Sequence, residues 1–236
     1  MLVPLPPEFA TTRDALHALA EHVLCAARHR VTGRIGLRAT LGGFGTPPFG
    51  DGERVRVEGI ELVHEIAGET RRAPVTTLGA AAAFVGIPLG APAGVFVPTT
   101  QADPDVLLAV DAGSATALAS WYAFADARFA DLRARHADQA PSETQLWPEH
   151  FDLATDLGDA DAHTRANYGA SPGDGGIAQP YLYAGPWDTT RRSGRFAEYS
   201  FGAAFTYAEL RAASDPADAG ARFLVECATA LLSAPE

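Results

Sequence analysis

The sequence predicts an α+β fold, in which a largely antiparallel β-sheet packs against several helices. Two observations predict it: stretches of strand-like alternation follow one another in groups, and the helical patterns stand apart from them. Hydrophobic residues make up 47% of the chain and charged residues 20%, which is enough to bury a core. The 236 residues fit a single domain, 1–236, or two tightly joined halves, 1–103 and 104–236.

The first helix is expected over residues 12–31, where apolar residues recur with helical spacing. Thr11 or Thr12 is expected as its N-cap, and Gly33 lies just past its end. His17, His22 and His29 lie on this helix, and His22 and His29 are expected at the surface.

Two segments that alternate arginine with apolar residues, 34–38 and 54–57, predict a β-hairpin with a long connection rich in glycine and proline. The alternation continues over 60–66, and a turn at 67–69 leads back into a further strand. His64 is in phase with the apolar face, so we expect a hydrogen-bonded histidine in the core or at its boundary.

The rest of the chain is expected to mix helices and strands. A short helix near 77–85 precedes a strand at 94–98, inside an uncharged stretch whose glycines and prolines would break a membrane helix. The other expected elements are a long helix over 114–136, strands at 145–157, 179–187 and 195–205, a helix after the capping-box pair Thr206 and Glu209, and a last helix opening at Asp215-Pro216.

The composition excludes several chemistries. All 18 basic residues are arginine, so the chain has neither the lysine of a P-loop nucleotide site nor one for a pyridoxal phosphate Schiff base. The net charge of −11 repels phosphate backbones and anionic lipids, so we expect no nucleic-acid and no membrane partner. Without a signal-like N-terminal pattern, a soluble, cytoplasmic protein is expected, and Cys25 and Cys227 are expected to be free, buried thiols. The oligomeric state stays open.

Gly169–Gly173 reads GASPG and matches the G-x-S-x-G pattern of α/β-hydrolases. We reject a nucleophile here because Pro172 has no N–H to donate to an oxyanion. In addition, no helical pattern follows, and His163 is the last histidine, whereas that fold needs one later in the chain. A tight turn at 172–174 explains the pattern instead.

The stretch QLWPEHFDLATDLG, residues 145–158, holds the first candidate site. On a strand, His150 and Asp152 would share one face, while Trp147 and Phe151 would point to the other. An imidazole and a carboxylate on one face suit metal ligation or acid–base catalysis. The sequence fixes no third ligand, so a strand with one solvated face is the alternative.

Tyr181 and Tyr183 share a face of the 179–187 strand, near a glycine-rich loop that carries Ser171 and Asp174. Packing at the edge of the core is one interpretation of these tyrosines. Our leading hypothesis is that they line a small-molecule pocket beside the 145–157 and 179–187 strands, together with His150 and Asp152. The alternatives are a metal-dependent or acid–base enzyme at the same place, and a protein-interaction module that uses a sheet edge or an apolar patch.

Four short motifs also suggest a relationship. They are FDL at Phe151–Leu153, SPGD at Ser171–Asp174, PYLY at Pro180–Tyr183 and TYAEL at Thr206–Leu210. Together with the long helix before them, they resemble an uncharacterised bacterial family that is catalogued as a domain of unknown function. The resemblance is best over residues 114–233 and looser over the N-terminal hairpins. It implies a single family domain and supplies no activity, cofactor or catalytic residue.

Overall fold

The computed structural model describes residues 2–233, and it divides the chain into two compact units. The N-terminal unit is made of Pro4–Ala123 and Leu146–Phe151, and the C-terminal unit is made of Met1–Val3, Phe124–Gln145 and Asp152–Glu236. Each unit combines helices with an antiparallel sheet, which confirms the α+β class.

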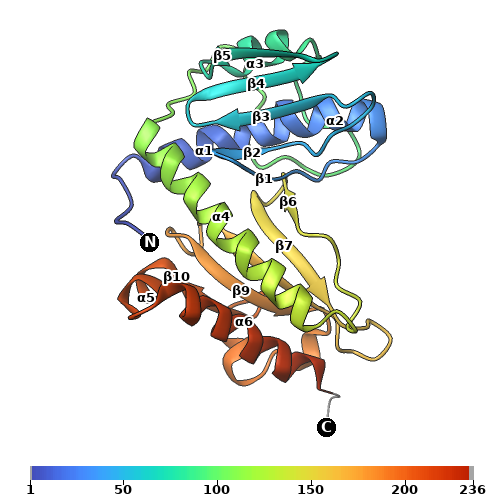
Figure 1. Ribbon diagram of the computed structural model, residues 1–236, viewed down its shortest axis with the longest axis vertical. Helices are drawn as coiled ribbons and strands as arrows, with labels where there is room; N and C mark the ends of the chain where they lie inside the picture. Colours follow the sequence, from blue (N-terminus) through green and yellow to red (C-terminus); the bar gives the residue numbers. More distant parts are fainter. Residues whose placement is uncertain (1, 234–236) are drawn as a thin grey trace. The chain divides into compact units, whose positions relative to one another are not determined.

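The N-terminal unit contains a five-stranded sheet in which each strand pairs with its neighbour in sequence, in the order β1-β2-β3-β4-β5. Its strands are β1 (Arg38–Thr40), β2 (Gly43–Gly45), β3 (Arg54–Glu58), β4 (Glu61–Ile66) and β5 (Glu69–Pro74). Its helices are α1 (Phe9–Leu19), the π-helical turn η1 (Ala20–Leu24), α2 (Cys25–Thr32) and α3 (Leu78–Val85). The long helix α4 (Ala112–Arg135) begins in this unit and ends in the other (Figure 1).

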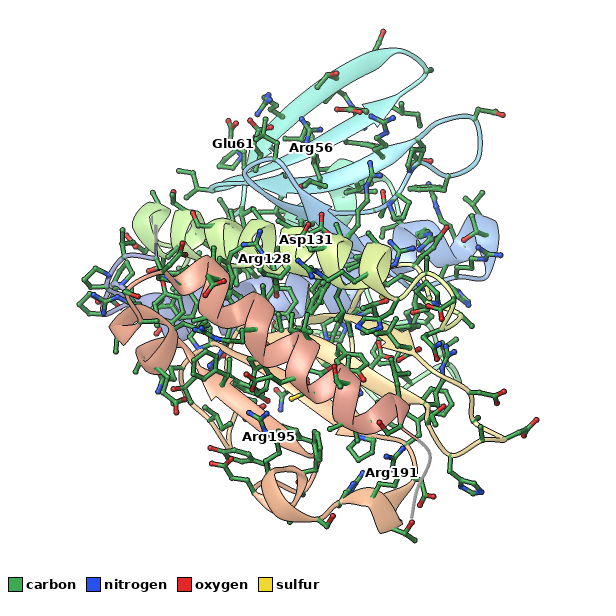
Figure 2. The ribbon with its side chains drawn as sticks, turned by 60° about the horizontal axis from the view of Figure 1, so that its bottom comes forward. Arg56, Glu61, Arg128, Asp131, Arg191 and Arg195 are labelled. Carbon is green, nitrogen blue, oxygen red and sulfur yellow. The ribbon has the colours of Figure 1, made fainter. Side chains whose placement is uncertain are left out.

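The two faces of this sheet differ in chemistry. Val55, Val57 and Leu62 are buried on the face that packs against the helices. The opposite face carries arginines and glutamates in ion pairs, from which Arg56 and Glu61 project in Figure 2. The pairs are Arg56 with Glu58 (3.0 Å) and Glu65 (2.5 Å), and Arg72 with Glu58 (3.0 Å) and Glu61 (2.9 Å). The predicted alternation of arginine with valine along β3 therefore places the arginines on one face of the sheet and the valines on the other.

The predicted first helix is confirmed, but it begins earlier than expected, at Phe9 after Glu8. The prediction of an N-cap at Thr11 or Thr12 is therefore wrong. Thr12 is buried instead, and its hydroxyl accepts the backbone N–H of Asp111 at 2.9 Å. The helix ends at Gly33, whose φ of 70° is the left-handed conformation that glycine adopts without strain.

Two strand predictions in this unit need correction. The long connection of the first hairpin contains a strand of its own, β2, where a Cβ at Gly43 would overlap the carbonyl of Val57. The expected strand at 94–98 is absent, because residues 93–95 form a turn between prolines that cannot donate a ladder hydrogen bond. The predicted β4–β5 turn and the short helix α3 are confirmed.

The C-terminal unit holds most of a second antiparallel sheet, in the order β10-β9-β8-β7-β6. Its strands are β6 (Gln145–Trp147), β7 (Asp152–Leu157), β8 (Ala166–Ser171), β9 (Tyr181–Pro186) and β10 (Ala203–Thr206). It also has helices α5 (Tyr207–Ala212) and α6 (Pro216–Leu232) and the short 3-10 turns η2 (Thr189–Arg191) and η3 (Gly194–Ala197). Strand β6 is shared, because only Gln145 belongs to this unit.

Helix α6 packs across β8 and β9 (Figure 1). Its Gly220 allows this close approach, since a Cβ there would lie 3.2 Å from Leu182 Cδ1. Arg191 sits at the C-terminal end of α6 (Figure 2), where it donates hydrogen bonds to the carbonyls of Ala230 (3.0 Å) and Ser233 (2.9 Å). These contacts satisfy carbonyls that a helix end leaves without partners.

The predicted helix starts here are confirmed: Thr206 and Glu209 form a capping box, and Asp215 caps α6. Strand β8 was not predicted, and β10 is much shorter than the expected 195–205 strand. Both cysteines are buried and free, as expected. Within residues 2–233, no helix has the length and apolar character needed to cross a membrane.

Tyr168 supplies a stability test for the helix-facing side of β8. Its hydroxyl is fully buried and has no hydrogen-bond partner among the described residues. Because an unsatisfied buried hydroxyl is costly, Tyr168→Phe should raise the free energy of unfolding by about 1 kcal/mol. Tyr122→Phe is the matched control, since the Tyr122 hydroxyl donates to the Phe151 carbonyl at 2.7 Å, and it should lower stability. Urea unfolding followed by tryptophan fluorescence measures both, and a less stable Tyr168→Phe would contradict the assignment.

Candidate functional site

The 145–158 stretch forms two strands joined by a turn at 148–151, not one strand. Pro148 lacks an N–H, and Phe151 takes a φ of 54°, which no strand accommodates. His150 therefore lies exposed in the turn, while Asp152 is buried at the start of β7. The prediction that these two residues share a strand face is wrong, and with it the acid–base or metal pair loses its geometric basis.

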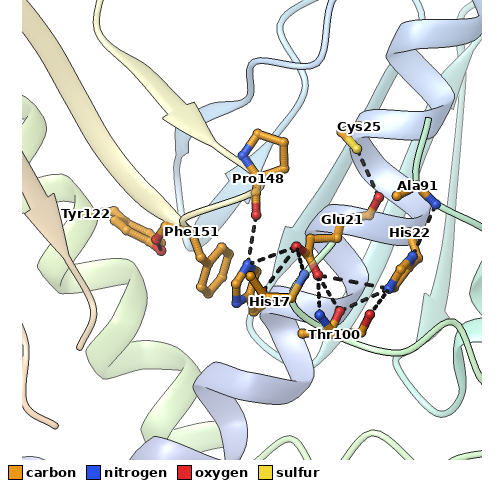
Figure 3. Close-up of polar contacts among 10 residues, drawn as sticks. His17, Glu21, His22, Cys25, Ala91, Thr100, Tyr122, Pro148 and Phe151 are labelled. Carbon is orange, nitrogen blue, oxygen red and sulfur yellow. Dashed lines mark hydrogen bonds and ion pairs between the residues drawn. The ribbon is translucent and has the colours of Figure 1, made fainter. Parts of the chain in front are cut away.

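Within the N-terminal unit, the turn is anchored by its aromatic and backbone groups (Figure 3). The ring of Phe151 stacks on His17 with centroids 5.0 Å apart, and the Tyr122 hydroxyl donates to the Phe151 carbonyl. His17 Nε2–H donates to the Pro148 carbonyl at 2.8 Å. The motif that suggested a site is thus largely an anchor for the turn.

The predicted ligand-binding residues do come together in the C-terminal unit. Ala154, Gly169 and Tyr183 form one row across β7, β8 and β9, because each is directly opposite the next. Side chains two positions apart on a strand share a face, so Asp152 and Tyr181 join this row. This face is opposite to the one that carries Leu182 against α6. We call it the polar face of the second sheet.

Hydrogen bonds tie the tyrosines of the polar face to carboxylates. The Tyr183 hydroxyl donates to Asp152 Oδ2, and the Tyr181 hydroxyl donates to Asp174 Oδ2 at 2.5 Å. Ser171 Oγ accepts the Gly173 N–H at 3.1 Å and so holds the turn after β8. The two tyrosine–aspartate pairs lie side by side, because the rings of Tyr181 and Tyr183 are 6.1 Å apart, and with the Ser171 turn they make up the polar cluster of this face.

Aromatic packing completes this cluster. Tyr181 stacks on Phe201 at 5.6 Å, and Tyr183 meets the same ring edge-on at 5.7 Å. The Tyr183 ring lies directly over Gly169, where any Cβ would overlap it. Gly169 belongs to the G-x-S-x-G match that we rejected as a nucleophile elbow. The structure gives it another role, because only glycine leaves room for the Tyr183 ring.

The titration behaviour of the cluster limits its chemistry. Burial, followed by the charge of Asp152, raises the pKa of Tyr183 well above its ordinary value. Burial and the hydrogen bond to Asp174 raise the pKa of Tyr181 in the same way. Both phenols stay protonated at neutral pH and act as donors. Asp156, on the same face, also has a raised pKa because of burial, which Arg165 at 3.4 Å partly opposes.

A second buried cluster lies in the N-terminal unit and was not predicted. Glu21 is fully buried, and its carboxylate accepts four hydrogen bonds from two consecutive threonines. Thr99 donates its N–H (2.8 Å) and hydroxyl (3.2 Å), and Thr100 donates its N–H (2.9 Å) and hydroxyl (2.5 Å). His17 lies 3.7 Å from the carboxylate, and burial lowers the pKa of His17.

The prediction that His22 is a surface residue is also wrong. His22 is buried, its Nδ1 accepts the Ala91 N–H at 3.1 Å, and its Nε2 lies 3.1 Å from the Thr100 carbonyl (Figure 3). Because Nδ1 accepts, the ring carries its hydrogen on Nε2 and donates to Thr100. The cause of the miss is that all five residues of η1 are buried, and the groups that cover Glu21 and His22 come from residues 90–100, far away in the sequence.

The interpretation of His64 is confirmed. It is buried in the core of the N-terminal unit and donates from Nε2 to Glu53 at 2.8 Å. Its Nδ1 accepts from Arg71 at 2.8 Å. Neither this cluster nor the others contains, within residues 2–233, three or more histidine, cysteine, aspartate or glutamate side chains placed to hold a metal ion.

Comparisons with protein-family models, with curated proteins and with solved structures gave no match. The resemblance to a bacterial family over residues 114–233 therefore stays a prediction.

Glu21→Gln tests the second cluster. The glutamine amide nitrogen cannot accept a hydrogen bond, so the backbone N–H of Thr99 or of Thr100 loses its acceptor. We expect the free energy of unfolding to fall by about 3 kcal/mol, as when one partner of a buried charged network is removed. Chemical denaturation measures the change, and Glu69→Gln at the exposed β4–β5 turn is the control. A loss no larger than that of the control would show that the carboxylate is not held as described.

Proposed function

We propose that the protein binds a small organic molecule on the polar face of the second sheet, at Asp152, Ser171, Asp174, Tyr181 and Tyr183. The observation that carries the proposal is the near-complete burial of Asp152, which is 6% exposed, beside a tyrosine donor on the face that points away from α6. Burying a carboxylate costs several kcal/mol even when it is bonded, roughly what a single such pair returns. A face built only for packing would avoid that cost, and strongly perturbed groups gather at functional sites.

The chemistry of the face favours a ligand with hydrogen-bond donors, and an amine above all. Asp152 and Asp156 supply acceptor oxygens, and the rings of Tyr181 and Tyr183 supply the negative π-faces that attract a cation. The whole chain carries a net charge of −11, which attracts cations and repels anions at longer range. An anionic ligand would oppose each of these charges.

An enzyme at the same place is less well supported. It was to rely on His150 as the base beside Asp152, and His150 is exposed in the turn outside β7. The raised pKa values keep both tyrosine phenols protonated at neutral pH, so neither can take up a proton as a base. Binding would use carboxylate oxygens as acceptors, because the Tyr183 and Tyr181 hydroxyls already donate to Asp152 and Asp174.

A protein-interaction role is a second candidate, because the N-terminal unit exposes apolar side chains between α3 and α4. Val97 is 87% exposed and Leu107 is 78% exposed, whereas most leucines and valines of the unit are buried. Apolar side chains gathered at a surface are typical of interaction sites. Sedimentation velocity should then show self-association that Leu107→Ser reduces, and a monomer at all concentrations would count against self-association.

Differential scanning fluorimetry tests the binding proposal directly. Spermidine and choline are the amine probes, with glucose as a neutral and citrate as an anionic comparison. We expect an amine probe to raise the Tm and the comparisons not to do so. Tyr183→Phe and Asp152→Asn should each weaken binding about tenfold, equivalent to the loss of one charge-assisted contact of about 1.4 kcal/mol.

Asp161→Asn is the matched control, because Asp161 is an exposed aspartate in the loop before β8. It removes the same charge from the chain without touching the polar face. If Asp161→Asn and Asp152→Asn weakened amine binding equally, the effect would be due to net charge and not to the polar face. Stabilisation by citrate instead of the amines would contradict the proposed ligand class.

A further inference from the structure

Trp187 directly follows β9 and lies exposed, which sets it apart from the other aromatic side chains of the second sheet. Within the described residues 108–233, it is the only large hydrophobic side chain that is exposed, at 54%. Its backbone N–H donates to the Arg165 carbonyl at 3.0 Å, so the pairing of β8 with β9 extends to it. Strand alternation places Trp187 and Arg165 on the polar face, at the end away from Tyr181.

The indole ring is fixed in place although it is exposed. Its N–H donates to Asn167 Oδ1 on β8. The Arg165 guanidinium covers one face of the ring, with Cζ 5.4 Å from the ring centroid. Arg165 is itself held by the carbonyls of Gly158 (3.0 Å) and Ala140 (3.3 Å). A single exposed apolar side chain is ordinary, but a ring whose orientation is already fixed has little conformational entropy left to lose when it binds a ligand.

One face of the ring is open, and a polar edge lies beside it. Arg165 is 21% exposed and lies against the other face, so the exposed part of Trp187 belongs mainly to the open face. Asn167 and Asp156 are directly opposite each other on β8 and β7 and form the polar edge. Because Asn167 Oδ1 accepts from the indole, its amide N–H groups are the donors of this edge, and the Asp156 carboxylate is the acceptor.

We propose that the open face of Trp187 binds an uncharged, planar heteroaromatic ring, such as a free purine. A ring of this kind stacks on an indole face and carries nitrogen donors and acceptors at its edge, which Asn167 and Asp156 can pair with. The site uses none of the residues proposed above for an amine, so the two proposals are independent.

The charges around the ring disfavour an ionic ligand. A cation on the open face would compete with Arg165 for the same π electrons and would lie across the ring from its positive charge. An anion would gain little from Arg165, which is already paired with Asp156 at 3.4 Å, and the net charge of −11 repels it.

The surroundings of Trp187 also disfavour a protein partner. The core of a protein interface is made of several apolar side chains, with polar groups at its rim. Trp187 is instead followed by Asp188, Thr189 and Thr190, and it is the one large apolar side chain exposed in the described residues 108–233. A single flat ring with polar neighbours fits a small ring ligand better.

Nuclear magnetic resonance of the full-length protein with ¹⁵N-labelled tryptophan tests the site. The chain has three tryptophans, so the spectrum holds three indole N–H signals, and Trp187→Phe identifies that of Trp187. We expect adenosine to shift the Trp187 signal in a saturable way and to leave those of Trp121 and Trp147 in place. Ribose alone should cause no shift, and the cationic ring N-methylpyridinium should cause a smaller one. No saturable shift of the Trp187 signal, or a larger shift with N-methylpyridinium, would overturn the proposal.

Variants assign the binding to the ring. Adenosine affinity, measured by calorimetry, should fall at least tenfold in Trp187→Ala, because stacking on the indole is lost, and less in Trp187→Phe, which keeps a smaller ring. Leu41→Ala is the matched control, since Leu41 is 95% exposed and its loss removes exposed apolar surface without a ring. Equal affinities in Trp187→Ala and Leu41→Ala would overturn the proposal.

Two further readouts separate this site from the other candidates. Any change in Tm that choline causes should be the same in Trp187→Ala as in the wild type, whether or not amines bind near Asp152. A choline effect that disappears in Trp187→Ala would make Trp187 part of an amine site and would overturn the proposal. Sedimentation velocity should likewise be unchanged, and a loss of self-association in Trp187→Ala would assign the ring to a contact between chains instead.

Discussion

Each of the two sheets buries an apolar face against helices of its own unit, and this constraint decides which side chains point the other way. In the N-terminal unit the opposite face is a lattice of arginine and glutamate, which pair with one another across β3, β4 and β5. In the C-terminal unit it carries aspartates and tyrosines, which bond to one another at much lower exposure. The first face is a solvent-exposed surface of ion pairs, whereas the second is a largely buried polar cluster.

The parts of the fold that follow strict periodicity could be predicted from the sequence. Alternation in RVRV and ELVHEI gives β3 and β4, and the apolar spacing after residue 112 gives α4. Caps give the starts of α5 and α6. Strand β8 was not predicted because ANYGAS has small residues where a strand usually has β-branched ones. The small residue at position 169 is needed because the Tyr183 ring lies directly over Gly169.

The candidate site was predictable only in part, because local alternation shows which side chains share a face but not which distant residues meet them. The face shared by Tyr181 and Tyr183 follows from strand alternation, and the structure brings Asp152, Ser171 and Asp174 to it. The predicted role of His150 was lost because a turn with a positive φ at Phe151 interrupts the expected strand, and Pro148 was the local signal against a continuous strand. Glu21 and His22 were missed because their burial depends on a segment about 70 residues later in the chain, through hydrogen bonds to Ala91, Thr99 and Thr100.

The π turn η1 also constrains how this chain can change length. A π turn has one residue more than the α turn that it replaces, and it sits between two regular helices, α1 and α2. Deleting one residue from Ala20–Leu24 would leave a helix of ordinary geometry, with no penalty in its own hydrogen bonds. The π turn and the α turn each complete one rotation, so the faces of α1 and α2 would stay in phase. The change would fall within the turn itself, where Glu21 and His22 bond to residues 90–100. A single-residue deletion would thus spare the helices on either side and alter only the polar contacts that the turn makes.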